Sequence, residues 1–382
     1  MIGKGPSTLQ RLRELGPTEG WVELDRLTPI FLESWQAIRA GAPLPATESP
    51  SLLEIARELA YRMLAHCNFC PWDCRVDRVA GAKLGACKLA SGSSVSSHFH
   101  HTGEELFYRG TQGSGTIFFT SCNMRCAFCQ NGDISTDKDN GEETDPRTLA
   151  AMAWMLRREG CHNINWVGGE VVIHLHAIVD AIALLGRDFI PTREELKRAR
   201  RTKADRFFGF DELPDAATYD GAFNAPMLWN SNFFITLESM KILRLLTDVW
   251  LPDFKFGPGR CAMTLAKTPW YWETVTRNIA LIAKWGEDLS IRHLVMPNHV
   301  ECCNPPGAGM DCRARAIGAG ERDGPSSVPI ISAIRPAPST VTSMRKSPAG
   351  RRAWSSAIPG GGRANWGSTS KQPPSSAAIR SG

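Results

Sequence analysis

The chain of 382 residues carries 44 Lys and Arg against 39 Asp and Glu, and 42% of its residues are hydrophobic. This length is sufficient for one large domain with additions. Twelve cysteines and a polar start, Met1–Gly16, argue against secretion and disulfides and favour metal or redox chemistry in a reducing compartment. No apolar run approaches the roughly 20 residues of a membrane helix, so we expect a cytoplasmic protein without a membrane partner.

The net charge of +5 is unevenly distributed. Residues 304–382 hold eleven Lys and Arg against three Asp and Glu, whereas the first 303 residues hold 33 basic and 36 acidic side chains. The body is therefore mildly acidic, and we expect no nucleic-acid partner. Nucleic-acid binding through the tail and the basic stretch 193–206 is the weakest interpretation of the chain.

The first 112 residues divide into a helical segment, residues 1–60, and a cysteine-rich segment, residues 61–112. Apolar residues from Leu52 to Met63 recur at helical spacing and predict a packing helix. Three histidines follow between His98 and His101, just before Gly103-Glu-Glu105. Metal binding is one interpretation of these histidines, and a turn beside solvent-exposed histidines is the one we favour.

Four cysteines of the cysteine-rich segment have the spacing C-x2-C-x3-C-x12-C. They are Cys67, Cys70, Cys74 and Cys87. Their number matches the ligand count of a tetrahedral zinc site and equally that of an iron–sulfur cluster. We expect a metal site here, with zinc and iron–sulfur both open; unliganded thiols are the alternative.

A β-branched and aromatic run, Thr116–Thr120, predicts a buried strand. It leads directly into Cys122, Cys126 and Cys129, which have the spacing C-x3-C-x2-C. Three thiolates on one short loop can hold three irons of a [4Fe–4S] cluster, and the fourth iron then stays open to a small molecule. A structural zinc site or plain core cysteines are the alternatives.

Strand-like and helix-like segments alternate through residues 113–303. The further strands are expected near 163–170, 226–232, 249–256 and 289–298. Asp145 and Thr236 are expected to cap two of the helices. This alternation predicts parallel strands joined by right-handed crossovers.

Residues 186–222 interrupt that alternation and are interpreted as an insertion. Its basic stretch, Thr192–Phe208, is a helical candidate that serves either as a solvated surface element or as an interaction arm.

Residues 304–382 change in character, because they contain no Leu, Phe or Tyr and are rich in Pro, Gly, Ser, Ala and Arg. Such a segment buries too little apolar surface to offset its ordering entropy. We interpret it as a low-complexity tail that is disordered or that results from a frameshift after Cys303. A frameshift predicts a Leu-rich helix and an apolar strand in another reading frame of the gene.

The strand, the C-x3-C-x2-C spacing and Phe128 before the last cysteine resemble the radical S-adenosylmethionine (SAM) enzymes. Within that superfamily, the flanking residues resemble homologues of pyruvate formate-lyase activating enzyme. The resemblance covers residues 67–303. It implies an α/β fold, a partial (βα)6 TIM-like barrel preceded by a cysteine-rich segment, with the sixth strand missing from this sequence and the reactive groups at the carboxyl ends of the strands.

The resemblance assigns Cys122, Cys126 and Cys129 to a [4Fe–4S] cluster whose open iron takes SAM. It also implies cofactor-binding residues at the strand ends, which are Gly168, Gly169, Glu170, Asn230, Asn232, Asp253, Lys255 and Arg292. Glu170 suits the SAM ammonium, Asp253 a ribose hydroxyl and Arg292 the methionyl carboxylate. No side chain is assigned as catalytic, since the cofactor carries the difficult step.

The implied reaction is reductive cleavage of SAM to methionine and a 5′-deoxyadenosyl radical, which abstracts hydrogen from an unknown substrate. A glycyl-radical enzyme is the protein substrate considered, and a donor of flavodoxin or ferredoxin type is the expected reductant. Two alternatives stay open: a non-catalytic iron–sulfur or metal-binding protein for electron transfer, and an inactive truncated remnant.

Overall fold

The computed structural model describes residues 16, 18–46, 50–186, 189–205 and 217–294, and the backbone of 330–335. The chain divides into two units, Met1–Val341 and Thr342–Gly382, and every described residue lies in the first.

One eight-stranded sheet organises the described part of the chain, with the order β10-β9-β8-β7-β4-β2-β1-β3. Its consecutive parallel strands are β2 (Ser114–Phe119), β4 (Ile164–Gly168), β7 (Met227–Ser231), β8 (Val249–Phe254) and β9 (Asp288–Leu294). Three antiparallel strands extend the sheet at its two ends: β1 (Ser94–His101), β3 (Glu142–Glu143) and β10 (Ile330–Arg335). The predicted parallel α/β order is confirmed, and the fold is that of a partial barrel.

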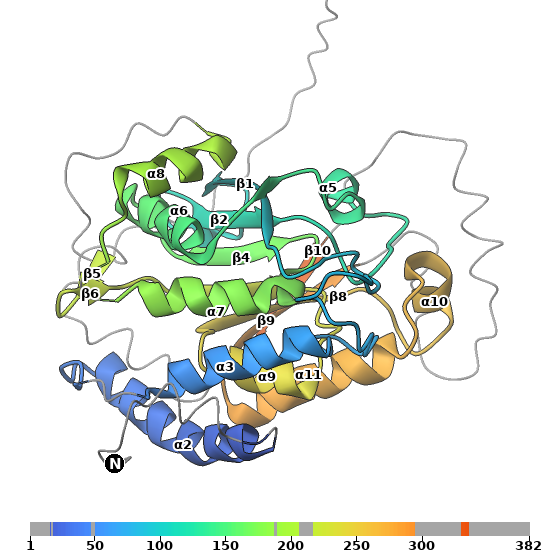
Figure 1. Ribbon diagram of the computed structural model, residues 1–382, viewed down its shortest axis with the longest axis horizontal. Helices are drawn as coiled ribbons and strands as arrows, with labels where there is room; N and C mark the ends of the chain where they lie inside the picture. The colour runs from blue at the N-terminus through green and yellow to red at the C-terminus, as the bar shows by residue number, and fades with distance from the viewer. Residues whose placement is uncertain are drawn as a thin grey trace, which may run out of the picture. The chain divides into compact units, whose positions relative to one another are not determined.

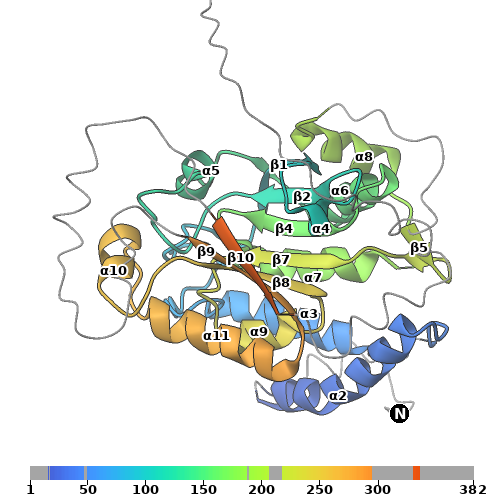
Figure 2. The same ribbon diagram turned by 180° about the vertical axis from the view of Figure 1, so that it is seen from behind.

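Helices fill the connections. The longer ones are α2 (Glu19–Arg39), α3 (Leu52–Ala65), α6 (Pro146–Arg158), α7 (Leu175–Leu184), α9 (Leu237–Leu243) and α11 (Tyr271–Trp285). The short ones are α4 (Leu106–Arg109), α5 (Gly132–Thr136), α8 (Arg193–Ala199) and α10 (Cys261–Ala266), with 3-10 turns η1 (Val171–His174) and η2 (Arg200–Thr202). A small hairpin joins β5 (Thr218–Tyr219) to β6 (Ala222–Phe223). Helices α3 and α7 lie in front of the strands in Figure 1 and behind them in Figure 2, so they cover one face of the sheet.

The predicted helix caps are present. Asp145 accepts a hydrogen bond from the backbone N–H of Thr148 at 2.9 Å, with Pro146 in the first turn of α6. Thr236 caps α9 through the N–H of Ser239. Such caps satisfy backbone donors that the helix leaves unpaired and stabilise it by about 1 kcal/mol each.

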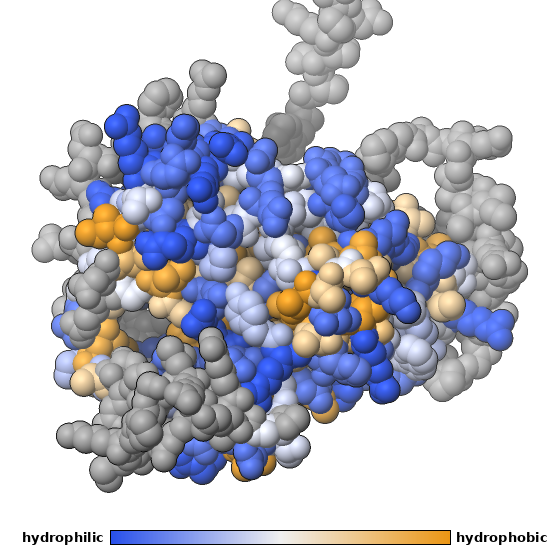
Figure 3. All heavy atoms as spheres, viewed as in Figure 1, coloured by the Kyte–Doolittle hydropathy of each residue, from blue (hydrophilic) through white to orange (hydrophobic). Residues whose placement is uncertain are grey.

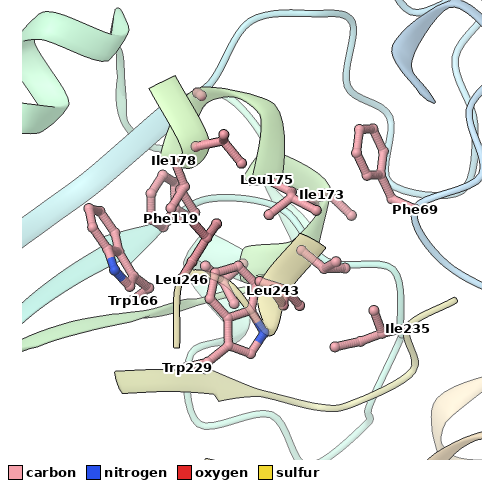
Figure 4. Packing of buried hydrophobic residues seen from close by; sticks show 14 of the residues in the cluster. Phe69, Phe119, Trp166, Ile173, Leu175, Ile178, Trp229, Ile235, Leu243 and Leu246 are labelled. Carbon is pink, nitrogen blue, oxygen red and sulfur yellow. The ribbon is translucent and has the colours of Figure 1, made fainter. Parts of the chain in front are cut away.

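Three tryptophans fix the register of the central strands. Trp166 pairs with Trp229, and Trp229 with Trp250, on adjacent strands, and each is at most 1% exposed. Figure 4 shows the first two in one cluster with Phe119 and with Phe69 of the cysteine-rich segment. Because side chains alternate along a strand, the residues next to these tryptophans point to the opposite, inner face of the sheet.

The interpretation of solvent-exposed histidines is wrong for two of the three. His98 and His100 lie on β1 and are 0% and 8% exposed, because β1 pairs antiparallel with β2 and adds an edge to the sheet. His98 Nδ1 lies 3.0 Å from Thr202 Oγ1, and His100 Nε2 lies 2.8 Å from Glu159 Oε2. Both histidines therefore connect β1 to the helical layer.

The basic stretch forms a shorter helix than predicted. It is helical as α8 and η2, ending at Thr202, and residues 206–208 lie outside the described residues. Lys203 pairs with Glu159 at 2.7 Å, and Arg198 with Asp145 at 3.0 Å. Some of its positive charge is therefore neutralised by carboxylates of the same chain. This favours a surface element over an interaction arm.

The tail differs from its prediction at six residues. Ile330–Arg335 form β10 and pair antiparallel with β9, where no strand was expected. Because β10 runs antiparallel, it does not supply the missing sixth parallel strand. The rest of 304–382, and the end of the fifth predicted strand beyond Leu294, lie outside the described residues.

The surface seen in Figure 3 is largely hydrophilic, with scattered apolar groups. Within the described residues, every helix is too short or too polar to cross a membrane.

Candidate cluster and cofactor site

The three clustered cysteines lie on the loop Cys122–Cys129, here called the cluster loop, just beyond the carboxyl end of β2. Cys122 is buried, and Cys126 and Cys129 are half-buried. The N–H of Arg125 donates to the carbonyl of Ala266 at 2.9 Å, and that of Ala127 donates to Leu265 at 2.7 Å. The end of α10 therefore holds the loop from the side opposite to β2.

Gly168 and Gly169 bring the end of β4 against the start of this loop. Gly169 N donates to the carbonyl of Phe119 at 2.9 Å, and Glu170 N donates to that of Ser121 at 2.8 Å. A Cβ on Gly169 would lie 1.7 Å from Ser121 O, and one on Gly168, whose φ is +136°, would lie 2.3 Å from the backbone of Phe119. The sequence suggested a close approach to a ligand; the structure has a close approach to the chain's own backbone.

Glu170 is 1% exposed and joins the ends of β4 and β7. Its Oε1 accepts from Val172 N at 3.0 Å and Ser231 Oγ at 2.7 Å, and its Oε2 accepts from Asn232 N at 3.0 Å. Burial raises the pKa of this carboxyl, although these hydrogen bonds favour its charged form. Its carboxylate therefore mainly accepts hydrogen bonds from the protein itself.

Asn232 connects the end of β7 to the cluster loop. Its Nδ2 donates to Asn123 Oδ1 at 2.8 Å and lies 3.7 Å from Cys122 Sγ. Asn230, near the end of β7, is 8% exposed. The strand end thus carries one buried amide within β7 and a second just beyond it.

Asp253 and Lys255 form an ion pair of 2.7 Å at the end of β8. Burial raises the pKa of the Cys126 thiol to about 11, and the ammonium of Lys255 acts against this rise. Lys255 therefore stabilises the thiolate that a metal requires.

Arg292 on β9 has two partners that the sequence analysis missed. Its Nε and Nη2 donate to the two carboxylate oxygens of Glu105 at 3.0 and 2.6 Å, and Nη2 also contacts Glu104. Asn165 Nδ2 donates to Glu104 at 2.8 Å. The two adjacent acidic residues in Gly103-Glu-Glu105 could have been recognised as candidates for an ion pair. Their neighbours in the sequence did not indicate that the partner would be Arg292, 187 residues from Glu105. A carboxylate ligand at Arg292 would have to replace Glu105.

The two carboxylates beside Arg292 are shifted in opposite directions. Burial raises the pKa of Glu104 to about 7. Burial also opposes the ionisation of Glu105, but hydrogen bonds from Arg292 and Glu104 lower its pKa to about 2. Two carboxylates that share one arginine cannot both ionise without cost, so one keeps its proton at neutral pH.

All nine described cysteines are free thiols. No three or more His, Cys, Asp or Glu side chains in the described ranges lie together in a way that would hold one metal ion.

The surroundings of the cluster-loop sulfurs fit an anionic iron–sulfur group. Met124 N donates to Cys122 Sγ at 3.3 Å, and Cys129 Sγ lies 3.3 Å from Ser135 Oγ. With Asn232 and Lys255 nearby, the thiolates would find hydrogen-bond donors and a positive charge, which are the groups that stabilise such clusters.

The model of the radical SAM superfamily matches residues 116–208, a range that contains the cluster loop and Gly168–Glu170. Residues 116–208 thus carry a radical SAM domain. Domains of this superfamily hold a [4Fe–4S] cluster and bind SAM. The chain is also 34% identical over 259 residues to an uncharacterized protein of Methanocaldococcus jannaschii, covering 66% of this chain and 64% of that relative. The match thus spans slightly less than two thirds of the relative's length.

Proposed function

We propose that the chain is an enzyme that cleaves SAM reductively at a [4Fe–4S] cluster held by Cys122, Cys126 and Cys129. The observation that carries this proposal is the placement of the cluster loop at the carboxyl edge of a parallel sheet, fixed there by the backbone of Gly169 and Glu170. When bound, the cluster and SAM supply the one-electron chemistry that yields methionine and a 5′-deoxyadenosyl radical.

The chain's own residues bind and orient the cosubstrate in this proposal. Asn230 and Asp253, on neighbouring strands, offer an amide and a carboxylate to the polar groups of SAM, and Lys255 holds Asp253 in place. Glu170 Oε2 accepts one protein hydrogen bond, so a second lone pair remains for the SAM ammonium. Arg292 is paired with Glu105, so it can bind the methionyl carboxylate of SAM only by exchanging Glu105 for it.

The resemblance suggests the substrate and the partners. We propose that the 5′-deoxyadenosyl radical abstracts a hydrogen atom from a substrate, with a glycyl-radical enzyme as the candidate considered. The proposed electron donor is of flavodoxin or ferredoxin type. We also propose a second metal at Cys67, Cys70, Cys74 and Cys87, either zinc or iron–sulfur.

Low-temperature EPR tests the cluster and its cosubstrate together. Anaerobically reconstituted, dithionite-reduced protein should give a [4Fe–4S]⁺ signal that shifts when SAM is added, with release of 5′-deoxyadenosine. A signal that ignores SAM would contradict the proposal and favour the electron-transfer alternative.

Two cysteine variants make this test specific. Cys126→Ala should remove the SAM-sensitive signal, because it deletes a cluster ligand. Cys161→Ala should keep it, since Cys161 is 0% exposed in the core and belongs to neither cysteine set. Equal loss in both variants would indicate general damage to the fold.

A further inference from the structure

Arg78 is a fully buried cation in the cysteine-rich segment. It is 0% exposed, and its guanidinium donates to the carbonyl of Ala90 at 3.0 and 2.8 Å and to that of Ile173 at 2.9 Å. It also lies over the ring of Phe69, 5.5 Å from the centroid. These partners are neutral, and none of the ion pairs found among the described residues includes Arg78. A buried charge is ordinarily paired, so this one lacks its counter-charge.

The titratable groups beside Arg78 do not supply that counter-charge. Burial lowers the pKa of His174 to about 3 and that of His176 to about 4, and Arg78 adds to both shifts. Both imidazoles are therefore neutral at physiological pH. Phe69, whose ring lies against the guanidinium, stands between Cys67 and Cys70 in the chain. A negative charge on the cysteine segment would therefore lie near Arg78.

Backbone hydrogen bonds connect the short segments that carry the four cysteines. The backbone of Cys67 exchanges hydrogen bonds with Val76 and Arg75, each of 3.0 Å, and Arg78 N donates to Leu64 O at 2.9 Å. Cys67, Cys70 and Cys87 are buried and Cys74 is half-buried. Asp73 N donates to Cys70 O at 3.0 Å, and Ala86 N, beside Cys87, donates to Cys74 Sγ at 3.4 Å, so hydrogen bonds connect the segments of all four cysteines.

Two further contacts suit a thiolate at Cys74. Ala86 N donates to Cys74 Sγ at 3.4 Å, and a Cβ on Gly85 would lie 2.8 Å from that sulfur. The glycine therefore lets the backbone approach the sulfur, and N–H groups directed at sulfur are a common second-shell feature of metal–thiolate centres.

We infer that Cys67, Cys70, Cys74 and Cys87 hold a metal centre of net negative charge and that Arg78 is its buried counter-charge. Four thiolates around one Zn²⁺, or around one [4Fe–4S]²⁺ core, carry the same net charge of about −2. Either centre gives Arg78 the partner that four neutral thiols cannot give. The inference deepens the second metal site of the proposed function, and its charge argument does not depend on the cluster loop or on SAM.

The segment of this centre contacts the cluster loop directly, and this step rests on the [4Fe–4S] part of the proposed function. Trp72 Nε1 donates to Asn123 O at 2.7 Å, and Ser121 Oγ donates to the carbonyl of Cys87. Asn123 Oδ1 lies 3.9 Å from Cys122 Sγ. Asn123 therefore contacts both a sulfur of the cluster loop and Trp72 of the cysteine-rich segment.

The test isolates the second set with the variant Cys122→Ala/Cys126→Ala/Cys129→Ala, reconstituted anaerobically with iron and sulfide or with zinc alone. We expect one centre per chain, of about four iron and four sulfide or of one zinc, and X-ray absorption should report four sulfur ligands. A folded variant without stoichiometric metal would overturn the inference. If this variant does not fold, full-length wild type should hold one centre more than Cys67→Ala/Cys74→Ala.

Arg78 is tested by the rate at which a chelator removes the metal from the isolated second set. Arg78→Gln should speed the loss at least tenfold, and Arg78→Lys should restore most of the retention. The control is Arg157→Gln, because Arg157 is 6% exposed and donates to carbonyls of Cys161, His162 and Asn224, away from the cysteine segment. Equal acceleration in both glutamine variants would overturn the role of Arg78.

These outcomes are separate from those of the proposed function. Cys67→Ala/Cys74→Ala retains the cluster loop, so its SAM-sensitive EPR signal reports on the proposed function whatever the second set binds.

Discussion

The two cysteine sets are both enclosed by the protein, but they are held in place by different means. Backbone carbonyls of α10, those of Leu265 and Ala266, hold the cluster loop, and the N–H of Gly169 holds the end of β2 just before it. Residues 66–93, which carry the other set, contain no helix or strand. Backbone hydrogen bonds close this segment on itself, and side chains contribute much of its attachment to the rest of the protein: Trp72 donates to Asn123 O, and Ser239 Oγ donates to Phe69 O at 3.0 Å.

This difference predicts where each region is sensitive to substitution. A loop held by backbone groups depends on positions where a side chain would separate two main chains. A segment held by side chains depends on single polar atoms, each contributing about 1 kcal/mol. The largest effects should therefore come from glycines near the cluster loop and the smaller ones from polar groups of the cysteine-rich segment.

Gly169→Ala should have the largest effect. The new Cβ would lie 1.7 Å from Ser121 O, so the end of β4 and the cluster loop must move apart. We expect a loss of about 3 kcal/mol or more in the free energy of unfolding. Iron content after reconstitution should fall in parallel. Both are measured by denaturant unfolding and metal analysis.

Gly132→Ala is the matched control, because a Cβ there meets nothing within 4 Å and the residue begins α5. Alanine is the better helix former, so this variant should be neutral or more stable by up to about 1 kcal/mol. A similar loss of stability and iron content in both variants would contradict the role given to the close backbone contact of Gly169.

A second comparison is between two buried arginines, Arg78 of the cysteine-rich segment and Arg292 of β9. Arg78 has only neutral partners, whereas Arg292 has two carboxylates, Glu104 and Glu105. The first lacks a negative charge, and the second faces one more than it can balance once Glu104 ionises above about pH 7. Removing one partner of a buried ion pair usually destabilises the folded state. Replacing Glu104 should instead stabilise it, because Glu105 remains as the partner of Arg292.

Glu104→Gln should be more stable than the wild type above pH 7. The native state keeps the proton of Glu104 up to about pH 7, whereas an unfolded glutamic acid loses it near pH 4.5, the ordinary value. The native state thus binds more protons between these values, and wild-type stability falls as the pH rises through them. Glutamine lacks this titration, so we expect a gain of about 1–3 kcal/mol at pH 8 and little at pH 5.

Denaturant unfolding of wild type and variant from pH 5 to pH 9 checks this. Glu143→Gln, an exposed position on β3, should stay within about 0.5 kcal/mol of the wild type at every pH. A constant difference between Glu104→Gln and the wild type across this range would contradict the buried surplus charge.

Trp72→Phe should have a moderate effect. It keeps most of the ring but removes the donor to Asn123 O, so a partly buried acceptor loses its partner. We expect a loss of about 1 kcal/mol in unfolding free energy and a weaker grip on the cluster loop, seen as faster iron loss. Trp270→Phe, at a side chain that is 61% exposed, should change neither. Unchanged iron retention in Trp72→Phe would show that this contact between the two cysteine sets does not help to hold the cluster loop.

The sequence was sufficient for the parts of the fold that local signals control. The β-branched run before Cys122 predicted β2, and Asp145 with Pro146 predicted the start of α6. Gly168-Gly169-Glu170 was placed correctly at the end of a strand, although its glycines turned out to contact the backbone of β2. Spacing and capping are properties of neighbouring residues, so they can be recognised without tertiary structure.

Pairings between distant residues left no such signal. The contact of Arg292 with Glu105 joins β9 to the segment after β1, and only the closed sheet brings them together. His98 and His100 looked solvent-exposed because their burial depends on β2 on one side and on Thr202 and Glu159 on the other. The strand at Ile330–Arg335 depends likewise on β9, and its surrounding composition predicts no strand.

Arg75→Gln should have the smallest effect and separates burial from charge within one segment. Arg75 lies three residues before Arg78 and pairs with Asp73 at 2.8 Å, but the two side chains are 68% and 42% exposed. Water screens such a pair, so we expect at most about 0.5 kcal/mol in unfolding free energy. The positive φ of residue 75, 54°, is borne equally by Gln and Arg, so backbone strain does not change. Metal loss to a chelator should keep its wild-type rate. If Arg75→Gln sped that loss as much as Arg78→Gln, the total positive charge of the segment would matter, and the buried position of Arg78 would not.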